Sequence, residues 1–147
     1  LVAGIVARFI ERLDTRRERC WIAARGDQRL GAVFLVKKAP GVAQLRLLIV
    51  EPAARGLGLG KKLVRACIRF ARAARYRKLV LWTQSELAAA RGIYVAGGFR
   101  LVRREAHESF GKQLDGEYWE LPLRPARASH RSRRRAQQRE PGGSPRR

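Results

Sequence analysis

Three glycines stand at every second position, Gly56, Gly58 and Gly60, between an apolar run and an amphipathic helix pattern. The apolar run, Val42–Val50, predicts a strand that is buried on both faces and that ends at Pro52. Glycine lets the backbone approach a ligand closely and adopt φ values that other residues resist. The first turn of the following helix leaves N–H groups unpaired, and the helix dipole adds positive potential there. The segment therefore predicts a cradle for a phosphate group.

Two cations at the rim, Arg55 and Lys61, add full positive charges to this cradle. Its spacing differs from that of the P-loop, which needs a Ser or Thr where Lys62 stands. It also differs from the dinucleotide-binding fingerprint, because the third glycine of that motif would fall on Lys61. Residues 78–84, which cover the next predicted strand and its end, also lack the acidic residue that would hold a ribose. Neither of these two common phosphate-binding motifs therefore explains the glycines.

Hydrophobic periodicity predicts a helix, three strands, a helix, a strand, a helix and two closing strands, with no internal repeat. These segments are Val2–Leu13, Cys20–Ala24, Leu30–Val36, Val42–Val50, Gly58–Ala74, Lys78–Trp82, Glu86–Val95, Phe99–Arg103 and Glu117–Leu121. We expect a polar loop between the two closing strands. The strand–helix–strand unit of residues 42–82 should form a right-handed parallel crossover.

Charge separates the end of the chain from its body. The formal net charge of the 147 residues is +21, and residues 124–147 hold nine Arg against one Glu. That segment has almost no large apolar side chain, so we expect a folded domain at 1–123 and a disordered Arg-rich tail at 124–147. Such a tail attracts polyanions without sequence preference. Both a solvated tail and a nucleic-acid arm remain open.

Several classes of protein are excluded by composition. Uncharged stretches are too short to span a bilayer, and two cysteines are too few for a disulfide scaffold. We therefore expect a cytoplasmic protein without membrane contact. The sequence contains no Met, which indicates a fragment of a longer chain.

The pattern Arg-x-x-Gly-x-Gly, formed by Arg55, Gly58 and Gly60, resembles the acyl-CoA pyrophosphate loop of the GNAT superfamily of N-acetyltransferases. A second segment, 90–99, resembles the Ala-x-x-x-Tyr-x-x-x-Gly-Phe motif of that family. Together the two motifs cover about residues 42–100 in the order of the family. More narrowly, four segments resemble the GNAT domain fused behind a MarR-type winged helix in bacterial regulators. These segments are 20–23, 33–38, 45–48 and 82–83.

The resemblance implies an α/β (α+β) fold. Its sheet is expected to be mixed, mostly antiparallel and twisted, with helices on both faces and a central parallel strand pair splayed for CoA. The first strand of the family and a DNA-binding domain are then expected upstream of Leu1.

The resemblance also implies acetyl-CoA as co-substrate, no metal, and transfer to a primary amine of a small molecule or a protein. Backbone groups of the strand before the glycines would bind pantetheine, and the loop and first helical turn would bind the pyrophosphate. The expected cofactor-binding residues are Leu48, Ile49, Val50, Arg55, Gly56, Leu57, Gly58, Leu59, Gly60 and Lys61. Tyr94 matches the family tyrosine that protonates the leaving thiolate. A phenol pKa of about 10 lies close enough to a thiol pKa of about 8.5 for this transfer.

The general base remains open, because strand 42–50 carries no carboxylate where some relatives have one. Glu51 is the tentative candidate, with Glu120, His107 and a water chain as alternatives. One position departs from the family pattern: Leu87 stands where many members carry Asn near the cofactor.

Two functions of other classes remain as alternatives. One is a CoA-sensing or partner-binding module of a MarR-type transcription regulator with little catalysis. The other is a nucleic-acid binder driven by charge, through an upstream domain or weakly through the tail. Oligomer formation is also left open by the sequence.

Overall fold

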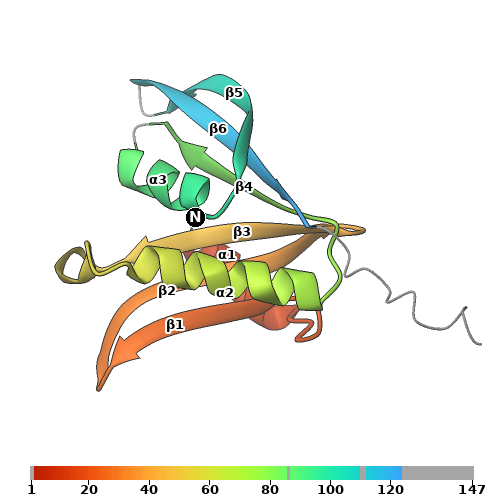
Figure 1. Cartoon of the computed structure of the whole chain (residues 1–147), viewed down its shortest axis with the longest axis vertical. Coiled ribbons are helices and arrows are strands. Elements are labelled where there is room, and N and C mark those ends of the chain that lie inside the picture. Colours follow the sequence, from red (N-terminus) through yellow and green to blue (C-terminus); the bar gives the residue numbers. More distant parts are fainter. Residues whose placement is uncertain (1, 86, 110–111, 124–147) are drawn as a thin grey trace, which may run out of the picture.

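The computed structural model describes residues 2–85, 87–109 and 112–123, which form one six-stranded sheet with helices against it (Figure 1). The helices are α1 (Val2–Glu11), α2 (Leu59–Ala73) and α3 (Ala88–Ala96), with a 3-10 turn η1 (Pro52–Ala54). The strands are β1 (Arg19–Arg25), β2 (Gln28–Ala39), β3 (Val42–Val50), β4 (Lys78–Gln84), β5 (Arg100–Ser109) and β6 (Lys112–Pro122). Segment 124–147, predicted as a disordered tail, lies outside the described residues.

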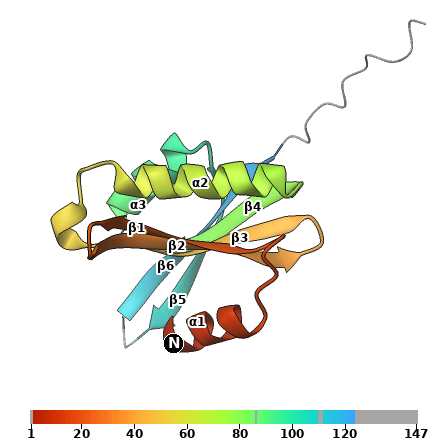
Figure 2. The same cartoon turned by 90° about the horizontal axis from the view of Figure 1, so that it is seen from below.

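The strand order is β1-β2-β3-β4-β6-β5, and every neighbouring pair is antiparallel except β3 and β4. Helix α2 joins that parallel pair, which confirms the predicted parallel crossover. Helices α2 and α3 lie on one face of the sheet and α1 lies on the other (Figure 2). The mixed, mostly antiparallel sheet with helices on both faces is therefore confirmed.

The parallel pair is short. Residues 42–44 of β3 pair with residues 78–80 of β4, and no later residues of the two strands pair within the described chain. Both strands nevertheless continue, to Val50 and Gln84, so they diverge from their shared end (Figure 1). Backbone N–H and C=O groups on this edge of β3 are consequently left without a strand partner.

A bulge in β3 lies beside the divergence. Its register against β2 shifts between Ala32 and Phe34, so that two residues, Leu47 and Leu48, oppose one on β2. Leu47 has a φ of 52°, which is rare for a residue with a side chain. The irregularity lies between the part of β3 that pairs with β4 and the part that diverges from it.

The core lies between α2 and the sheet. Helix α2 buries an apolar stripe that includes Leu63, Val64 and Cys67, against strand residues such as Leu35 and Leu79. On the opposite face, the ring of Phe9 in α1 meets the ring of Phe34 edge-on at 5.1 Å between centroids. This face is less completely covered, so the prediction that β3 is buried on both faces is wrong: only Ala43 and Leu45 of β3 are buried, Ile49 is exposed and the rest are half-buried.

The C-terminal hairpin is longer than predicted. The segment between Arg103 and Glu117, expected to be a polar loop, is mostly strand in β5 and β6. Its many charged residues were the reason for the error, because charged side chains on the outer strand of a sheet give the same pattern as a loop. Helix α3 ends as predicted, since the N–H of Phe99 donates to the carbonyl of Tyr94 at 3.0 Å and Gly98 takes a φ of 90°.

Candidate active site

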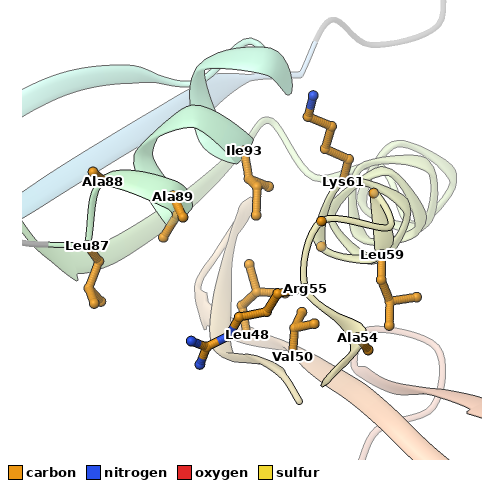
Figure 3. A pocket seen from close by; sticks show the side chains of 14 residues that line it. Leu48, Val50, Ala54, Arg55, Leu59, Lys61, Leu87, Ala88, Ala89 and Ile93 are labelled. Carbon is orange, nitrogen blue, oxygen red and sulfur yellow. The ribbon is translucent and has the colours of Figure 1, made fainter. Parts of the chain in front are cut away.

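A groove of about 790 Å³ lies between the diverging end of β3, the start of α2 and the first turn of α3 (Figure 3). Its walls are mostly apolar, with Arg55 and Lys61 as the two cations. The lining residues are Leu48, Val50, Ala54, Arg55, Gly56, Gly58, Leu59, Gly60, Lys61, Leu87, Ala88, Ala89, Ala90 and Ile93.

The glycines at the mouth of the groove serve two different purposes. Gly56 and Gly58 have φ values of 80° and 72°, a conformation that favours glycine. A Cβ atom at either position would meet no other heavy atom within 4 Å, so the mouth is open. Gly60 is buried instead, and a Cβ there would lie 2.6 Å from Cδ1 of Ile93. Its missing side chain therefore lets α2 approach α3.

The open mouth exposes the positive end of α2. Gly58 is the N-cap, no side chain caps the helix, and its first turn contains no acidic residue. The N–H groups of Leu59, Gly60 and Lys61 consequently have no partner within the helix. Together with the helix dipole and the two cations, these donors form a site for an anion. In Figure 3 the side chain of Arg55, from the loop, and that of Lys61, from the first turn of α2, project in different directions.

Most of the residues predicted to bind the cofactor line this groove. The structure brings together Leu48, Val50, Arg55, Gly56, Gly58, Leu59, Gly60 and Lys61. Ile49 and Leu57 are exposed and do not line it. For Ile49 the reason is the pleat, which turns successive side chains to opposite faces of a strand.

The wall supplied by α3 was not among the predicted binding residues. Leu87, the three alanines of 88–90 and Ile93 complete the groove opposite β3. The only sequence signal was the run of small side chains at the start of the helix, which leaves room beside the backbone. Leu87 lies at the groove as an exposed apolar side chain.

Tyr94 lies behind this wall. It is 5% exposed, and its ring contacts those of Phe99 and Trp119 at centroid distances of 6.0 and 6.4 Å. Burial disfavours the phenolate and raises the pKa of Tyr94 to about 12. Tyr94 therefore keeps its proton across the physiological range, and its pKa lies further above a thiol pKa of about 8.5 than the ordinary phenol value used in the sequence prediction. Its helix neighbour Ile93 lines the groove, whereas Tyr94 itself does not.

Neither Glu51 nor Glu120, the two candidate bases whose side chains the structure describes, lines the groove. Glu51 is exposed beside η1, where its backbone N–H donates to the carbonyl of Leu30 at 2.9 Å. Glu120 is ion-paired with Lys78, whose Nζ lies 2.7 Å from Oε1. The side chain of His107 lies outside the described part of the structure.

The described residues contain no group of three or more His, Cys, Asp or Glu that could hold a metal. None of the described helices has the length and hydropathy of a membrane-spanning segment.

Burial of Tyr94 and Cys67 predicts a loss of stability at alkaline pH. Burial raises the pKa of Cys67 from 9.0 to about 12, and that of Tyr94 from 10.0 to about 12. Well below pH 9 both groups are neutral in the folded and the unfolded chain, so their contribution to stability does not change with pH. As pH rises towards 12 the unfolded chain ionises first, and folding loses about 2 to 3 kcal/mol through Tyr94 alone. Urea unfolding at stepped pH should show this loss to be smaller in Tyr94→Phe than in the wild type. Parallel curves for the two proteins would contradict the assignment.

Comparison with known proteins gives a consistent set of relatives. The profile described as "Acetyltransferase (GNAT) family" matches residues 4–99. The N-acetyltransferase 8B of Rattus norvegicus is 38% identical over 93 residues, which are 60% of this chain and 42% of that protein. The mycothiol acetyltransferase of Amycolatopsis mediterranei is 31% identical over 87 residues, or 59% of this chain and 24% of that protein. The chain therefore spans less than half the length of these relatives.

Solved structures share the fold at lower identity. A Bacillus subtilis acetyltransferase in complex with CoA has a TM-score of 0.67 and 24% identity, covering 82% of this chain and 83% of that one. A Salmonella typhimurium protein, yncA, described as a structure with its cofactor acetyl-CoA, has a TM-score of 0.73 and 21% identity, covering 86% and 76%. At these identities the likeness establishes the architecture alone.

Proposed function

The chain belongs to the GNAT acetyltransferase family, and from this premise we propose that it transfers an acetyl group from acetyl-CoA to a primary amine. The observation that carries the proposal is the uncapped start of α2, which opens into a groove beside two diverging parallel strands. A plain strand–helix turn would need neither an open mouth nor a separated strand pair.

The diphosphate of CoA fits the mouth of α2. N–H groups at residues 59–61 donate to its oxygens, and the positive φ values of Gly56 and Gly58 shape the loop around it. Arg55 and Lys61 add charge-assisted contacts at the rim. The formal net charge of +21 also favours the approach of a multiply charged anion.

The pantetheine arm fits the edge of β3. Beyond Gln44 this edge pairs with no other strand among the described residues, so its backbone groups are available to the amides of an extended ligand. The apolar side chains of Leu48, Val50 and Ile93 line the groove along that edge. A pantetheine arm that binds there pairs with the edge of β3 where β4 no longer does. Its thioester end then lies in the gap between β3 and β4.

The transfer itself needs a nucleophile, an oxyanion donor and an acid. The neutral amine attacks the thioester carbonyl, and a backbone N–H near residues 48–50 stabilises the oxyanion. Collapse of the tetrahedral intermediate breaks the carbon–sulfur bond, and Tyr94 gives its proton to the leaving thiolate. This role requires the sulfur to pass beyond the residues that line the groove, into the gap between β3 and β4 and towards the Tyr94 ring. The attacking nitrogen must lose one proton to form the amide, and Glu51, which lies outside the groove, accepts it only through intervening water.

A product assay tests the proposal. The purified chain is incubated with acetyl-CoA and a panel of small amines and peptides, and products are sought by the mass of one added acetyl group. We expect acetylated product, and stabilisation of the fold by about 2.7 kcal/mol when acetyl-CoA exceeds its Kd a hundredfold. Stabilisation without product across the panel would favour the alternative, a CoA-sensing module such as that of a MarR-type regulator. Absence of stabilisation would contradict cofactor binding altogether.

A further inference from the structure

A buried carboxylate lies behind the groove, at a position that the proposed chemistry does not use. Glu117 on β6 is 0% exposed. Its Oε2 accepts a hydrogen bond from Nε1 of Trp119 at 3.1 Å and lies 3.3 Å from Nε of Arg91. Its Oε1 lies 3.2 Å from Nε of Arg104. One carboxylate thus contacts three side chains, from α3, β5 and its own strand.

A charge in such a place needs partners that stay in position. Taking a carboxylate out of water is costly, and only close cations and donors offset that cost. The two arginines reach Glu117 from partly exposed positions, with side chains 37% and 58% exposed. Neither Nε of Arg91 nor Oε1 of Glu117 makes an aligned hydrogen bond. These two contacts are therefore charge pairs, for which a well-placed ammonium group is an adequate substitute.

The contacts of Glu117 lead to both parts of the candidate site. Arg91 follows the alanines 88–90 of the groove wall and stands one helical turn before Tyr94, so it belongs to the same short helix. Trp119, held by the same oxygen of Glu117, contacts the Tyr94 ring. A change in the contacts of Glu117 is therefore expected to alter the position of the groove wall at 88–90 and that of the Tyr94 ring at the same time.

We propose that Glu117 is a positioning residue, which fixes α3 to the sheet through Arg91 and thereby sets the groove wall and the orientation of Tyr94. The effect on CoA binding rests on the proposed function, whereas the anchoring of α3 does not. Arg104 pairs with the same carboxylate from β5 and has no part in α3. Substitutions of Arg91 and Arg104 can therefore be compared: both remove a charge beside Glu117, but only a substitution of Arg91 also removes the contact that anchors α3.

The test compares Arg91→Met with Arg104→Met, each of which leaves Glu117 one arginine so that the chain can fold. Three quantities are measured: the free energy of unfolding, amide hydrogen exchange across 88–96, and the Kd for CoA. We expect both variants to lose stability. Only Arg91→Met should speed exchange in α3 and weaken CoA binding, by roughly tenfold. Arg91→Lys should restore the Kd to within about twofold of the wild type, because the ammonium replaces the charge.

Two results would overturn the proposal. One is unchanged exchange of the α3 amides in Arg91→Met. The other is equal loss of CoA affinity in Arg91→Met and Arg104→Met, which would mean that both arginines act only by balancing charge. If the wild type fails to bind CoA, the proposed function is wrong, and the exchange rates of α3 still decide whether Glu117 anchors the helix.

Discussion

Replacing Tyr94 by Phe is expected to lower turnover at saturating acetyl-CoA by roughly a hundredfold or more, with the Kd for acetyl-CoA nearly unchanged. The substitution removes only the hydroxyl, and the ring contacts with Phe99 and Trp119 remain. The thiolate then leaves without the proposed proton donor. Because burial raises the pKa of Tyr94 to about 12, the donor form persists up to strongly alkaline pH, and the difference should hold across pH 6 to 9.

A matched control is available in the same core. Tyr76 is 2% exposed, burial raises the pKa of its phenol, and its hydroxyl donates to the carbonyl of Arg17 at 2.7 Å, away from the groove. Tyr76→Phe should cost about 1 kcal/mol of stability through the lost hydrogen bond and leave turnover intact. Initial rates for the two variants, measured on any amine that the wild type acetylates, separate the cases. Full turnover in Tyr94→Phe would remove the tyrosine from the mechanism.

The parts of the site that the sequence predicts are those built from consecutive residues. Gly56, Gly58 and Gly60 lie within five positions, and their chemistry depends on local backbone conformation, which glycine spacing reveals. The apolar run of β3 ends directly before the loop, and the family resemblance assigns Leu48 and Val50 to the cofactor site on that ground. For this reason the cradle and its flanking strand were located without a structure.

The parts that escaped prediction depend on contacts between distant segments. Alanines 88–90 carry no distinctive chemistry, and only the packing of α3 beside the start of α2 makes them a groove wall (Figure 1). Glu117 is surrounded by side chains from two other elements, so no spacing along the chain marks it. The same limit applies to the parts of β5 after Arg103 and of β6 before Glu117, whose charged residues indicate a loop although cross-strand pairing makes them strand.

Replacing Gly58 by Trp is expected to lower the affinity for acetyl-CoA by about a hundredfold or more. A side chain at this residue would stand at the open mouth of α2, beside the N–H groups that we propose to bind the diphosphate. Each hydrogen bond to a charged group that is lost there costs about 1.5 to 3 kcal/mol. The positive φ of 72° also makes any side chain there unfavourable, by about 1 kcal/mol.

Gly26 provides the control for this backbone strain. It has a φ of 56°, a Cβ there would also meet nothing within 4 Å, and it lies in the turn between β1 and β2, outside the groove. Gly26→Trp should therefore lose a similar amount of stability in thermal unfolding and keep the affinity of the wild type. Equal loss of affinity in both variants would assign the effect to strain rather than to the mouth of α2.

The most direct measurement is a calorimetric titration of the wild type and Gly58→Trp, each with acetyl-CoA and with S-acetylpantetheine, which lacks the diphosphate. If the amides of α2 hold that diphosphate, the wild type should bind acetyl-CoA about a hundredfold more tightly than the truncated thioester. Gly58→Trp should lose most of this preference, because the substitution removes the contacts to the diphosphate. Any preference that remains comes from the 3'-phosphoadenosine, which the truncated thioester also lacks. Equal affinity of the wild type for both ligands, or a full hundredfold preference retained in Gly58→Trp, would contradict the account.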